Sequence, residues 1–203
     1  MIAIIDYGAG NLSSVKKALD YLGAESEITD DKEKILAASH VILPGVGSFG
    51  DAMASMQERG LVEVVKEAAG SGKPFLGICL GLQLLFESSD ESPDVQGLGI
   101  LNGQIVTIPK ERGLKVPHMG WNSIALKQNS GIFDGVADNS YFYFVHSYYL
   151  KGADADAVAA TTQYGVEIEC AVQKGKLCAT QFHPEKSGSA GLKLLKNFID
   201  MEG

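Results

Sequence analysis

The sequence is poor in cysteine, and its cysteines are spaced for neither disulfides nor zinc. Only Cys79, Cys170 and Cys178 occur, and the apolar residues 2–5 run straight into Asp6 without the small-residue cleavage site of a signal peptide. Zinc sites use closely spaced ligand pairs, whereas Cys170 and Cys178 stand eight positions apart and no second short-spaced pair exists. We therefore expect a reducing cytoplasm, no bound metal and no cofactor.

Long apolar runs and basic clusters are absent as well. The most apolar stretch, residues 75–86, is 12 residues long, whereas a membrane-spanning helix needs about 20. With 17 Lys and Arg against 25 Asp and Glu, the formal net charge is −8, and no Lys- or Arg-rich run occurs. Neither a nucleic acid nor a membrane is therefore expected as a partner.

What the sequence does contain is the composition of a globular protein. Hydrophobic residues make up 45% of its 203 positions and charged residues 21%, which is too apolar for a disordered chain. No repeat, linker or low-complexity tract divides the chain. Residues 1–203 are expected to form a single domain with one sizeable core.

Segments typical of strands and helices alternate in the first half. Asp30 is expected to cap a helix that ends at Ser39, with Glu33 in a capping-box arrangement. The alternation predicts a parallel sheet with right-handed crossovers, which binds ligands beyond the carboxyl ends of its strands. The other predictions are strands at 2–5, 25–28, 41–43 and 75–79 and helices at 12–22, 50–59, 61–69 and 80–87.

The second half is rich in predicted strands separated by Gly, Asn and Lys turns. A closing helix at 189–201 has its apolar residues along one stripe. The whole chain is therefore expected to be one α/β domain with extra strands added late. The strands are predicted at 100–108, 114–124, 141–150, 157–163, 169–173 and 177–182.

A Gly-Ile-Cys-Leu-Gly motif at residues 77–81 is the sharpest local feature. It lies between a predicted strand and a predicted helix, so it matches a nucleophile elbow in which Cys79 takes the place of serine. A thiol at the start of a helix has its thiolate favoured by the helix dipole. The alternative is a buried cysteine packed as a small hydrophobe, although such packing does not need both flanking glycines.

A base and an orienting group for this thiol are offered by Phe-His-Pro-Glu at residues 182–185. Residues i and i+2 of an extended segment face the same side, so Glu185 is placed to hold the imidazole of His183 while Pro184 fixes the backbone. The alternative is a plain turn with a surface carboxylate. The other histidines have less favourable sequence contexts: His40, His118 and His146.

An oxyanion hole, the third component of such a site, is expected from the Pro-Gly-Val-Gly loop at residues 44–47. The backbone at Gly45 and Val46 can turn an amide toward a tetrahedral intermediate beside the amide of Leu80. A loop that merely reverses the chain is equally consistent with these four residues. However, this loop and Cys79 both follow predicted parallel strands, where a site is expected.

These motifs resemble those of the class I (triad) glutamine amidotransferases, in that family's order and over most of the chain. The resemblance implies a flavodoxin-like fold, with a mostly parallel sheet flanked by helices and additional antiparallel strands in the C-terminal half. No departure occurs at Cys79, His183 or Glu185. Further segments resemble one branch of the family, the glutaminase subunits of imidazole glycerol phosphate synthase: residues 5–12, 44–49, 117–122 and 143–149.

The resemblance also implies roles for individual residues. Cys79 attacks the side-chain amide of glutamine, His183 acts as base and then as acid toward departing ammonia, and Glu185 orients His183. A γ-glutamyl thioester forms and is hydrolysed to glutamate. Gln83 is expected to contact the bound glutamine, together with Gly47, Glu91, Ser147 and Tyr148.

The partner implied by the resemblance is a (β/α)₈-barrel cyclase subunit, which receives the ammonia and acts on a ribulosyl-aminoimidazole nucleotide in histidine biosynthesis. Since no part of the chain looks like an ammonia-accepting domain, a heterodimer is expected. The alternatives for two of the expected interface residues are Trp121 as a core anchor and Lys186 as a solvated charge. The expected interface residues are Asn11, Trp121, Tyr143 and Lys186.

Val46 suggests how such a partner controls the glutaminase, which in these complexes is usually weak until the cyclase and its ligand are bound. Many relatives carry a second glycine at this place, and a β-branched residue resists the positive φ values that glycine accepts. Our hypothesis is that the Gly45–Val46 peptide rests with its amide turned away and that the partner flips it inward.

Two functions of other classes stay open at this point. Gly8 and Gly10 follow the first predicted strand like part of a dinucleotide fingerprint, although Ser13 stands at the third glycine position. A nucleotide-binding module would be stabilised by NAD or a mononucleotide and not by glutamine. A stand-alone cysteine hydrolase of the same superfamily would not need Gln83 and would act without a partner.

Overall fold

The computed structural model describes residues 1–8, 10–110, 113–128 and 130–203. Ala9, which belongs to the segment at residues 5–12, lies outside the described residues. Strands and helices alternate up to residue 84, apart from two successive helices between residues 49 and 70, and strands dominate from residue 84 to residue 180. None of the helices formed by the described residues combines the length and apolar character needed to cross a bilayer.

The central sheet has eight strands in the order β2-β1-β3-β4-β13-β12-β11-β8. The first five are parallel to one another, and the last three are antiparallel. The expected fold class is thus confirmed. The strands, in sheet order, are β2 (Ser26–Thr29), β1 (Ile2–Ile5), β3 (His40–Gly45), β4 (Phe75–Cys79), β13 (Leu177–Thr180), β12 (Val166–Lys174), β11 (Val158–Tyr164) and β8 (Ala125–Leu126).

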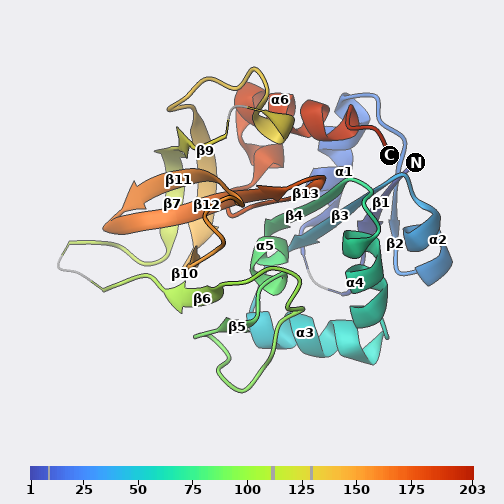
Figure 1. Cartoon of the computed structure of the whole chain (residues 1–203), viewed down its shortest axis with the longest axis horizontal. Helices are drawn as coiled ribbons and strands as arrows, with labels where there is room; N and C mark the ends of the chain where they lie inside the picture. Colours follow the sequence, from blue (N-terminus) through green and yellow to red (C-terminus); the bar gives the residue numbers. More distant parts are fainter. Residues whose placement is uncertain (9, 111–112, 129) are drawn as a thin grey trace.

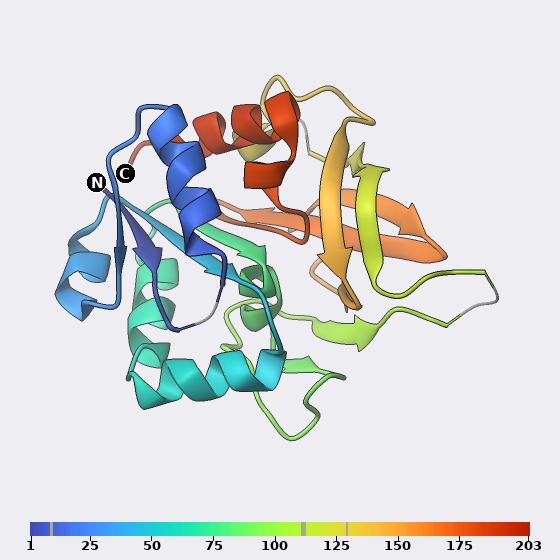
Figure 2. The same ribbon diagram turned by 180° about the vertical axis from the view of Figure 1, so that it is seen from behind.

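Both faces of this sheet are covered, as a parallel sheet requires. In β1, Ala3 and Ile5 enter one buried cluster, while Ile2 and Ile4 enter the other. Figures 1 and 2 show α1 and α6 on one face and α3, α4 and α5 on the other. The helices are α1 (Leu12–Tyr21), α2 (Lys32–Ala37), α3 (Phe49–Glu58), α4 (Val62–Gly70), α5 (Leu80–Leu84) and α6 (Gly188–Ile199).

Two of the differences between predicted and observed helix boundaries have a clear physical cause. The carboxylate of Asp31, not of Asp30, caps α2 by accepting hydrogen bonds from the backbone N–H groups of Glu33 and Lys34. Asp30 is instead paired with Arg59 at 3.2 Å. The predicted helix 80–87 ends at residue 84 because the next two N–H groups bond three residues back, which tightens and stops the helix.

Two small sheets account for the remaining strands. The predicted strand 141–150 is divided at Ser147, since its two halves pair with different partners that the local pattern does not reveal. The strands predicted at 100–108 and 114–124 are shorter in the structure, where they are β6 and β7. The strands are β7 (His118–Ser123) with β9 (Tyr141–His146), and β10 (Tyr148–Lys151) with β6 (Gln104–Thr107) and β5 (Ser88–Ser89).

Two glycines allow α5 to start directly on top of the sheet. A methyl group on Gly81 would overlap the carbonyl oxygen of Leu43 in β3, and one on Gly77 would lie 2.9 Å from the carbonyl oxygen of Gly81. Both contacts are to backbone, which cannot move aside cheaply. The glycines on each side of Cys79 are therefore needed for the close approach of strand and helix.

Replacing Gly81 with alanine is expected to lower the free energy of unfolding by about 3 kcal/mol, because the added methyl overpacks the strand–helix contact. Gly70→Ala is the matched control, since a methyl group there meets no atom within 4 Å. The control should stay within about 1 kcal/mol of the parent, on the stabilising side. Urea unfolding of both variants measures this, and equal stabilities would contradict the argument.

Candidate active site

Three sequence-predicted components meet at the carboxyl ends of the adjacent strands β3, β4 and β13. Cys79 ends β4, the loop at residues 44–47 ends β3, and His183 follows β13. This edge of a parallel sheet is where ligands bind in such folds. The structure thus brings together residues that are up to about 140 positions apart in the chain.

Cys79 occupies a strained turn. Its φ is 55° and its ψ is −108°, a region that L-residues seldom adopt and that costs of order 1–3 kcal/mol. It is only 6% exposed, and its Sγ lies 3.8 Å from the carbonyl oxygen of Val145. The turn presents the thiol at the start of α5, as a nucleophile elbow does.

His183 and Glu185 form a buried pair. The Nδ1 of His183 lies 2.8 Å from Oε1 of Glu185, and both side chains are almost completely buried. The predicted pairing is thus present, but the reason given for it was wrong. His183 is extended, whereas Pro184–Lys186 forms a 3₁₀ turn, η2, that brings the carboxylate back under the imidazole.

The environment of His183 favours its protonated form. Burial by itself lowers the pKa of His183, but the interactions with Cys79 and Glu185 outweigh it and raise this pKa to about 9. The Nε2 atom of His183 is buried without a hydrogen-bond partner among the described residues. A histidine of this kind can support a neighbouring thiolate and hold a proton for a leaving group.

The loop at residues 44–47 lies directly beside the elbow. Gly45 is the register partner of Cys79 across β3 and β4. A methyl group on Gly45 would overlap the hydroxyl of Tyr7 and lie 3.1 Å from the Cβ of Leu80. Val46 is 38% exposed, and it is not among the described non-glycine residues with positive φ. The expected oxyanion-hole backbone, Gly45, Val46 and Leu80, is therefore contiguous.

Gly10 also has a structural use. Its φ is 117°, and a Cβ at this position would lie 3.4 Å from the Cα of Gly45. Glycine is favoured here because L side chains rarely adopt this φ, at a point where the loop after β1 lies against the loop after β3. Gly8 also has a positive φ, of 87°, so the backbone conformation of this loop explains the fingerprint-like spacing of Gly8 and Gly10 without a nucleotide.

One pocket adjoins the thiol. Its volume is about 240 Å³, and Val145, whose carbonyl oxygen faces Cys79 Sγ, forms part of its wall. Glu91 is held in place because its Oε2 accepts a hydrogen bond of 2.7 Å from the backbone N–H of Phe49. All five residues expected around the substrate line this pocket: Gly47, Gln83, Glu91, Ser147 and Tyr148.

Two buried histidines beside this pocket were missed by the sequence analysis. His146 Nδ1 lies 2.8 Å from the carbonyl oxygen of Tyr148, and its Nε2 lies 2.9 Å from Nδ1 of His118. A carbonyl only accepts, so Nδ1 of His146 carries the proton, its Nε2 accepts, and Nδ1 of His118 donates. Asn122 completes the chain at Nε2 of His118. No local sequence signal marks this pair.

Both of these histidines are held neutral. Burial lowers the pKa of His118 to about 4. Burial lowers the pKa of His146 to about 3, and the charges of His118 and His183 act in the same direction, against the hydrogen bond to the Tyr148 carbonyl. An added proton would also place two N–H groups face to face.

An apolar surface lies on the outer face of the β7–β9 hairpin, which joins the site through β9. Trp121 is paired with Tyr143 in register, and their ring centroids are 6.2 Å apart. Trp121 is 55% exposed, so its interpretation as a core anchor was wrong. The backbone N–H of His183 donates to the carbonyl oxygen of Tyr143 at 2.9 Å. We call Met119, Trp121, Tyr141 and Tyr143 the hairpin surface.

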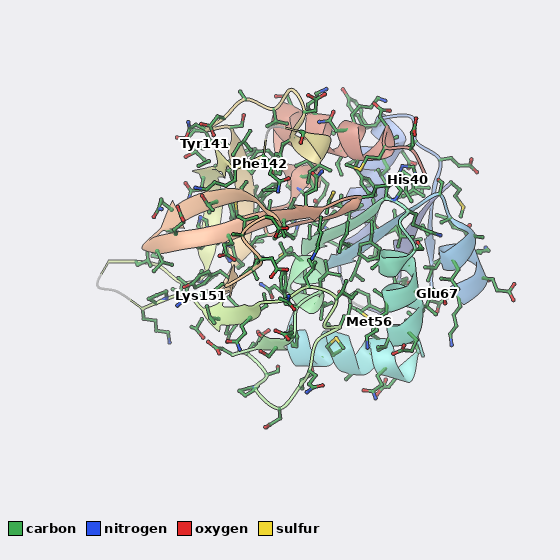
Figure 3. All side chains as sticks on the ribbon, in the orientation of Figure 1. His40, Met56, Glu67, Tyr141, Phe142 and Lys151 are labelled. Atoms are coloured by element: carbon green, nitrogen blue, oxygen red, sulfur yellow. The ribbon has the colours of Figure 1, made fainter. Side chains whose placement is uncertain are left out.

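The strand alternation that creates this surface is visible at one end of β9. Tyr141 and Phe142, labelled in Figure 3, are neighbours in the chain, yet Tyr141 is 61% exposed and Phe142 is fully buried.

Of the other two residues expected at the partner interface, Asn11 is exposed and Lys186 is half-buried. Among the described residues, no three His, Cys, Asp or Glu side chains converge in a way that could hold a metal ion.

The family description that matches this chain is glutamine amidotransferase class-I, over residues 3–201. The chain is 53% identical over 200 residues to imidazole glycerol phosphate synthase subunit HisH of Moorella thermoacetica, covering 98% of this chain and 94% of that protein. It is 50% identical over 201 residues to the protein of the same name from Caldanaerobacter subterraneus subsp. tengcongensis, covering 99% and 98%.

Solved structures with the same fold include a crystal structure of a glutamine amidotransferase, with a TM-score of 0.76 at 20% identity, covering 98% of both chains. Another is PurLQS from Thermotoga maritima, with a TM-score of 0.75 at 22% identity, covering 98% of this chain and 97% of that chain. At such identities the likeness concerns the fold alone.

Stability is expected to fall on both sides of neutral pH. Since an unfolded histidine titrates near pH 6.5, the lowered pKa values of His118 and His146 favour unfolding as the pH falls from 6.5 toward 4. The raised pKa of His183 acts in the opposite sense, so its stabilisation is lost as the pH rises through about 9.

Urea midpoints measured from pH 4.5 to 9.5 check this expectation. His118→Phe keeps a ring stacked between Phe144 and Tyr164 and should flatten only the acid side of the profile. His183→Gln should flatten only the alkaline side. A profile unchanged by either substitution would contradict the assignment of these three protonation states.

Proposed function

This chain belongs to the class I glutamine amidotransferase family, and from this premise we propose that it is the glutaminase subunit of an imidazole glycerol phosphate synthase. It hydrolyses the side-chain amide of glutamine and passes the ammonia to a separate cyclase subunit. The observation that carries this proposal is the elbow thiol of Cys79, placed with the His183–Glu185 pair beside the pocket that contains Gln83.

In the first half of the reaction, the thiolate of Cys79 attacks the carboxamide carbon of glutamine. The carbonyl oxygen takes the negative charge, and the C–N bond then breaks as His183 gives its proton to the departing nitrogen. Ammonia leaves and a γ-glutamyl thioester remains on Sγ. Glu185 holds Nδ1 of His183, so that Nε2 is the atom that exchanges the proton.

In the second half, water replaces ammonia. His183 takes a proton from the water, whose oxygen attacks the thioester carbonyl carbon, and the C–S bond breaks to release glutamate and restore the thiolate. The side chains of His183 and Glu185 are at most 3% exposed. Because bulk water does not reach them, the proton passes only between His183 and the reacting groups. The same histidine thus serves as the acid in the first half and as the base in the second.

The tetrahedral intermediates need donors for their oxyanion. The backbone N–H of Leu80 and an amide of the Gly45–Val46 segment are our candidates, because these segments are packed against each other at the elbow. Val46 is not at positive φ in this structure, which agrees with the hypothesis that the peptide must be turned by a partner before the hole is complete.

The partner is a barrel cyclase subunit, and the hairpin surface is its docking site on this chain. Exposed tryptophan, tyrosine and methionine side chains clustered on one face are typical of protein–protein contacts. Asn11 and Lys186 are proposed to flank this contact. Ammonia released at Cys79 would be protonated in bulk water and lose its nucleophilicity, so a sealed contact next to the triad makes chemical sense.

The whole of residues 1–203 is proposed as one glutamine amidotransferase domain, since the family match extends over residues 3–201. A reducing cytoplasm is the proposed compartment, in which the free thiol of Cys79 persists. A stand-alone cysteine hydrolase and a nucleotide-binding module remain as outcomes of the test below.

Glutamate release from glutamine tests the proposed function. It should be slow with this chain alone, rise on addition of the barrel cyclase, and rise further with the cyclase and its nucleotide ligand. Cys79→Ala should lower the rate in the full mixture at least about 10³-fold, because the nucleophile is lost. Size-exclusion chromatography verifies that the parent chain and Cys79→Ala both form the complex with the cyclase.

Two other outcomes would redirect the assignment. Release that is equally fast without the cyclase indicates a stand-alone hydrolase. No release by a verified complex, together with a higher melting temperature in NAD or a mononucleotide, indicates a nucleotide-binding module.

Val46→Gly is expected to raise glutamate release by the isolated chain, by about tenfold, because glycine accepts the backbone conformation that valine resists. Val46→Ala, which lacks the β-branch but keeps Cβ, should lie between the two. Steady-state rates of the three proteins without cyclase measure the effect. Unchanged rates would show that steric restraint at Val46 does not hold the activity down.

A further inference from the structure

Gln181 is a buried polar side chain that the proposed reaction does not use. It is 0% exposed and follows directly after β13. Its backbone N–H donates to the carbonyl oxygen of Cys170 at 2.8 Å. Thr180 pairs with Ile78 in the parallel register of β13 and β4, so Gln181 stands opposite Cys79. The two strands that carry the base and the nucleophile therefore fix its position.

The carboxamide of Gln181 connects the nucleophile with the pocket. Its Nε2 lies 3.8 Å from Sγ of Cys79, and its Oε1 accepts a hydrogen bond of 3.0 Å from Nε2 of Gln83. Cys79 directly precedes α5, and Gln83 lies within this helix four residues later. A single side chain thus spans both groups.

The carbonyl of Tyr148 sets the direction of these hydrogen bonds. Because a carbonyl oxygen only accepts, the atom of Gln83 that faces it at 3.1 Å is the donor Nε2. The second N–H of Gln83 then points at Gln181, whose facing atom must be Oε1. Only this arrangement turns the amide nitrogen of Gln181 toward the sulfur of Cys79 and satisfies every partner.

The first consequence concerns the substrate. Both N–H groups of Gln83 are used inside the protein, by Tyr148 and Gln181. Its Oε1 is therefore the group left for the pocket, and it accepts from an N–H donor of the substrate. Without Gln181 the carboxamide of Gln83 would keep one of its two anchoring hydrogen bonds, the one to the Tyr148 carbonyl, and its oxygen would be held less firmly toward the pocket.

The second consequence concerns the thiol. The carbonyl oxygen of Val145, 3.8 Å from Sγ, can only accept a hydrogen bond, so it is a partner for the S–H group of Cys79. The N–H of Gln181 can only donate a hydrogen bond, so it is a partner for the thiolate. These two neighbours act in opposite directions on the same sulfur.

We propose that Gln181 is a positioning residue, which holds the oxygen of Gln83 toward the substrate and donates a hydrogen bond to the Cys79 thiolate. The identity of the substrate, glutamine, rests on the proposed function. The ammonium and carboxamide groups of the substrate glutamine carry the N–H donors from which Oε1 of Gln83 accepts a hydrogen bond.

Two substitutions separate the two parts of this role. Gln181→Met keeps the length of the side chain and removes both hydrogen bonds. Gln181→Glu keeps an oxygen opposite Nε2 of Gln83 and removes the amide donor to Cys79. Gln173→Met is the matched control, because Gln173 lies on the paired strand β12 and bonds the backbone of Ile132, away from the thiol. Circular dichroism and thermal unfolding verify that each variant is folded.

The first measurement is the rate at which iodoacetamide alkylates Cys79 in the full chain, from pH 6 to 9, with the modified residue identified by mass spectrometry. Cys170 and Cys178 are buried, and burial raises the pKa of the Cys178 thiol to about 12, so Cys79 dominates. Both Gln181 variants should react about fivefold more slowly at pH 7, with the profile moved to higher pH. Gln173→Met should match the parent.

The second measurement is the KM for glutamine in the complex with the cyclase. Gln181→Met should raise KM about tenfold, whereas Gln181→Glu should keep it within about threefold of the parent while lowering kcat. This split distinguishes positioning from a general loss of structure. An equal rise of KM in both variants would overturn the assigned orientation of Gln83.

Alkylation decides the sulfur contact whether or not the complex releases glutamate. Unchanged alkylation in both folded Gln181 variants, or an equal slowing in Gln173→Met, overturns the inference. If Gln181→Met does not fold, the alkylation profile of Gln181→Glu alone decides whether the hydrogen bond to the thiolate exists. Loss of glutamate release in the parent complex, by contrast, contradicts only the proposed function.

Discussion

The contact between the start of α5 and the end of β3 is the constraint on which the site depends. Gly81 lies against the carbonyl of Leu43, and Gly77 against the carbonyl of Gly81, so the chain can turn from strand to helix within one residue. That residue is Cys79, which takes the strained backbone conformation. The turn decides where the thiol, the amide of Leu80 and the side chain of Gln83 lie.

Histidines in this structure are held in opposite protonation states, according to whether their partners outweigh the effect of burial on the pKa. His183 faces a carboxylate and a thiol, and its pKa rises to about 9 despite burial. His146 is buried, and burial lowers its pKa to about 3 because the hydrogen bond to the Tyr148 carbonyl does not compensate for it. The charged histidine is therefore suited to proton transfer, while neutral His146 lines the pocket with its hydrogen bonds held in a fixed direction.

Strand β9 connects the proposed docking surface with the site through its backbone. Tyr143 belongs to the hairpin surface, and its carbonyl oxygen accepts from the N–H of His183. Two residues later, the carbonyl oxygen of Val145 lies against the sulfur of Cys79. A partner that packs on this hairpin therefore contacts the strand that supports both the base and the nucleophile, which gives partner control a short physical path.

The sequence by itself determined the order of the strands and helices, the elbow at Cys79 and the pairing of His183 with Glu185, because these depend on local periodicity, turn chemistry and short spacing. Only the tertiary structure decided that residues 141–150 divide between two sheets, that Trp121 is exposed, and that Gln181, His118 and His146 reach the site. Their roles depend on hydrogen bonds between residues as many as 102 positions apart, and no local pattern records the direction of such bonds.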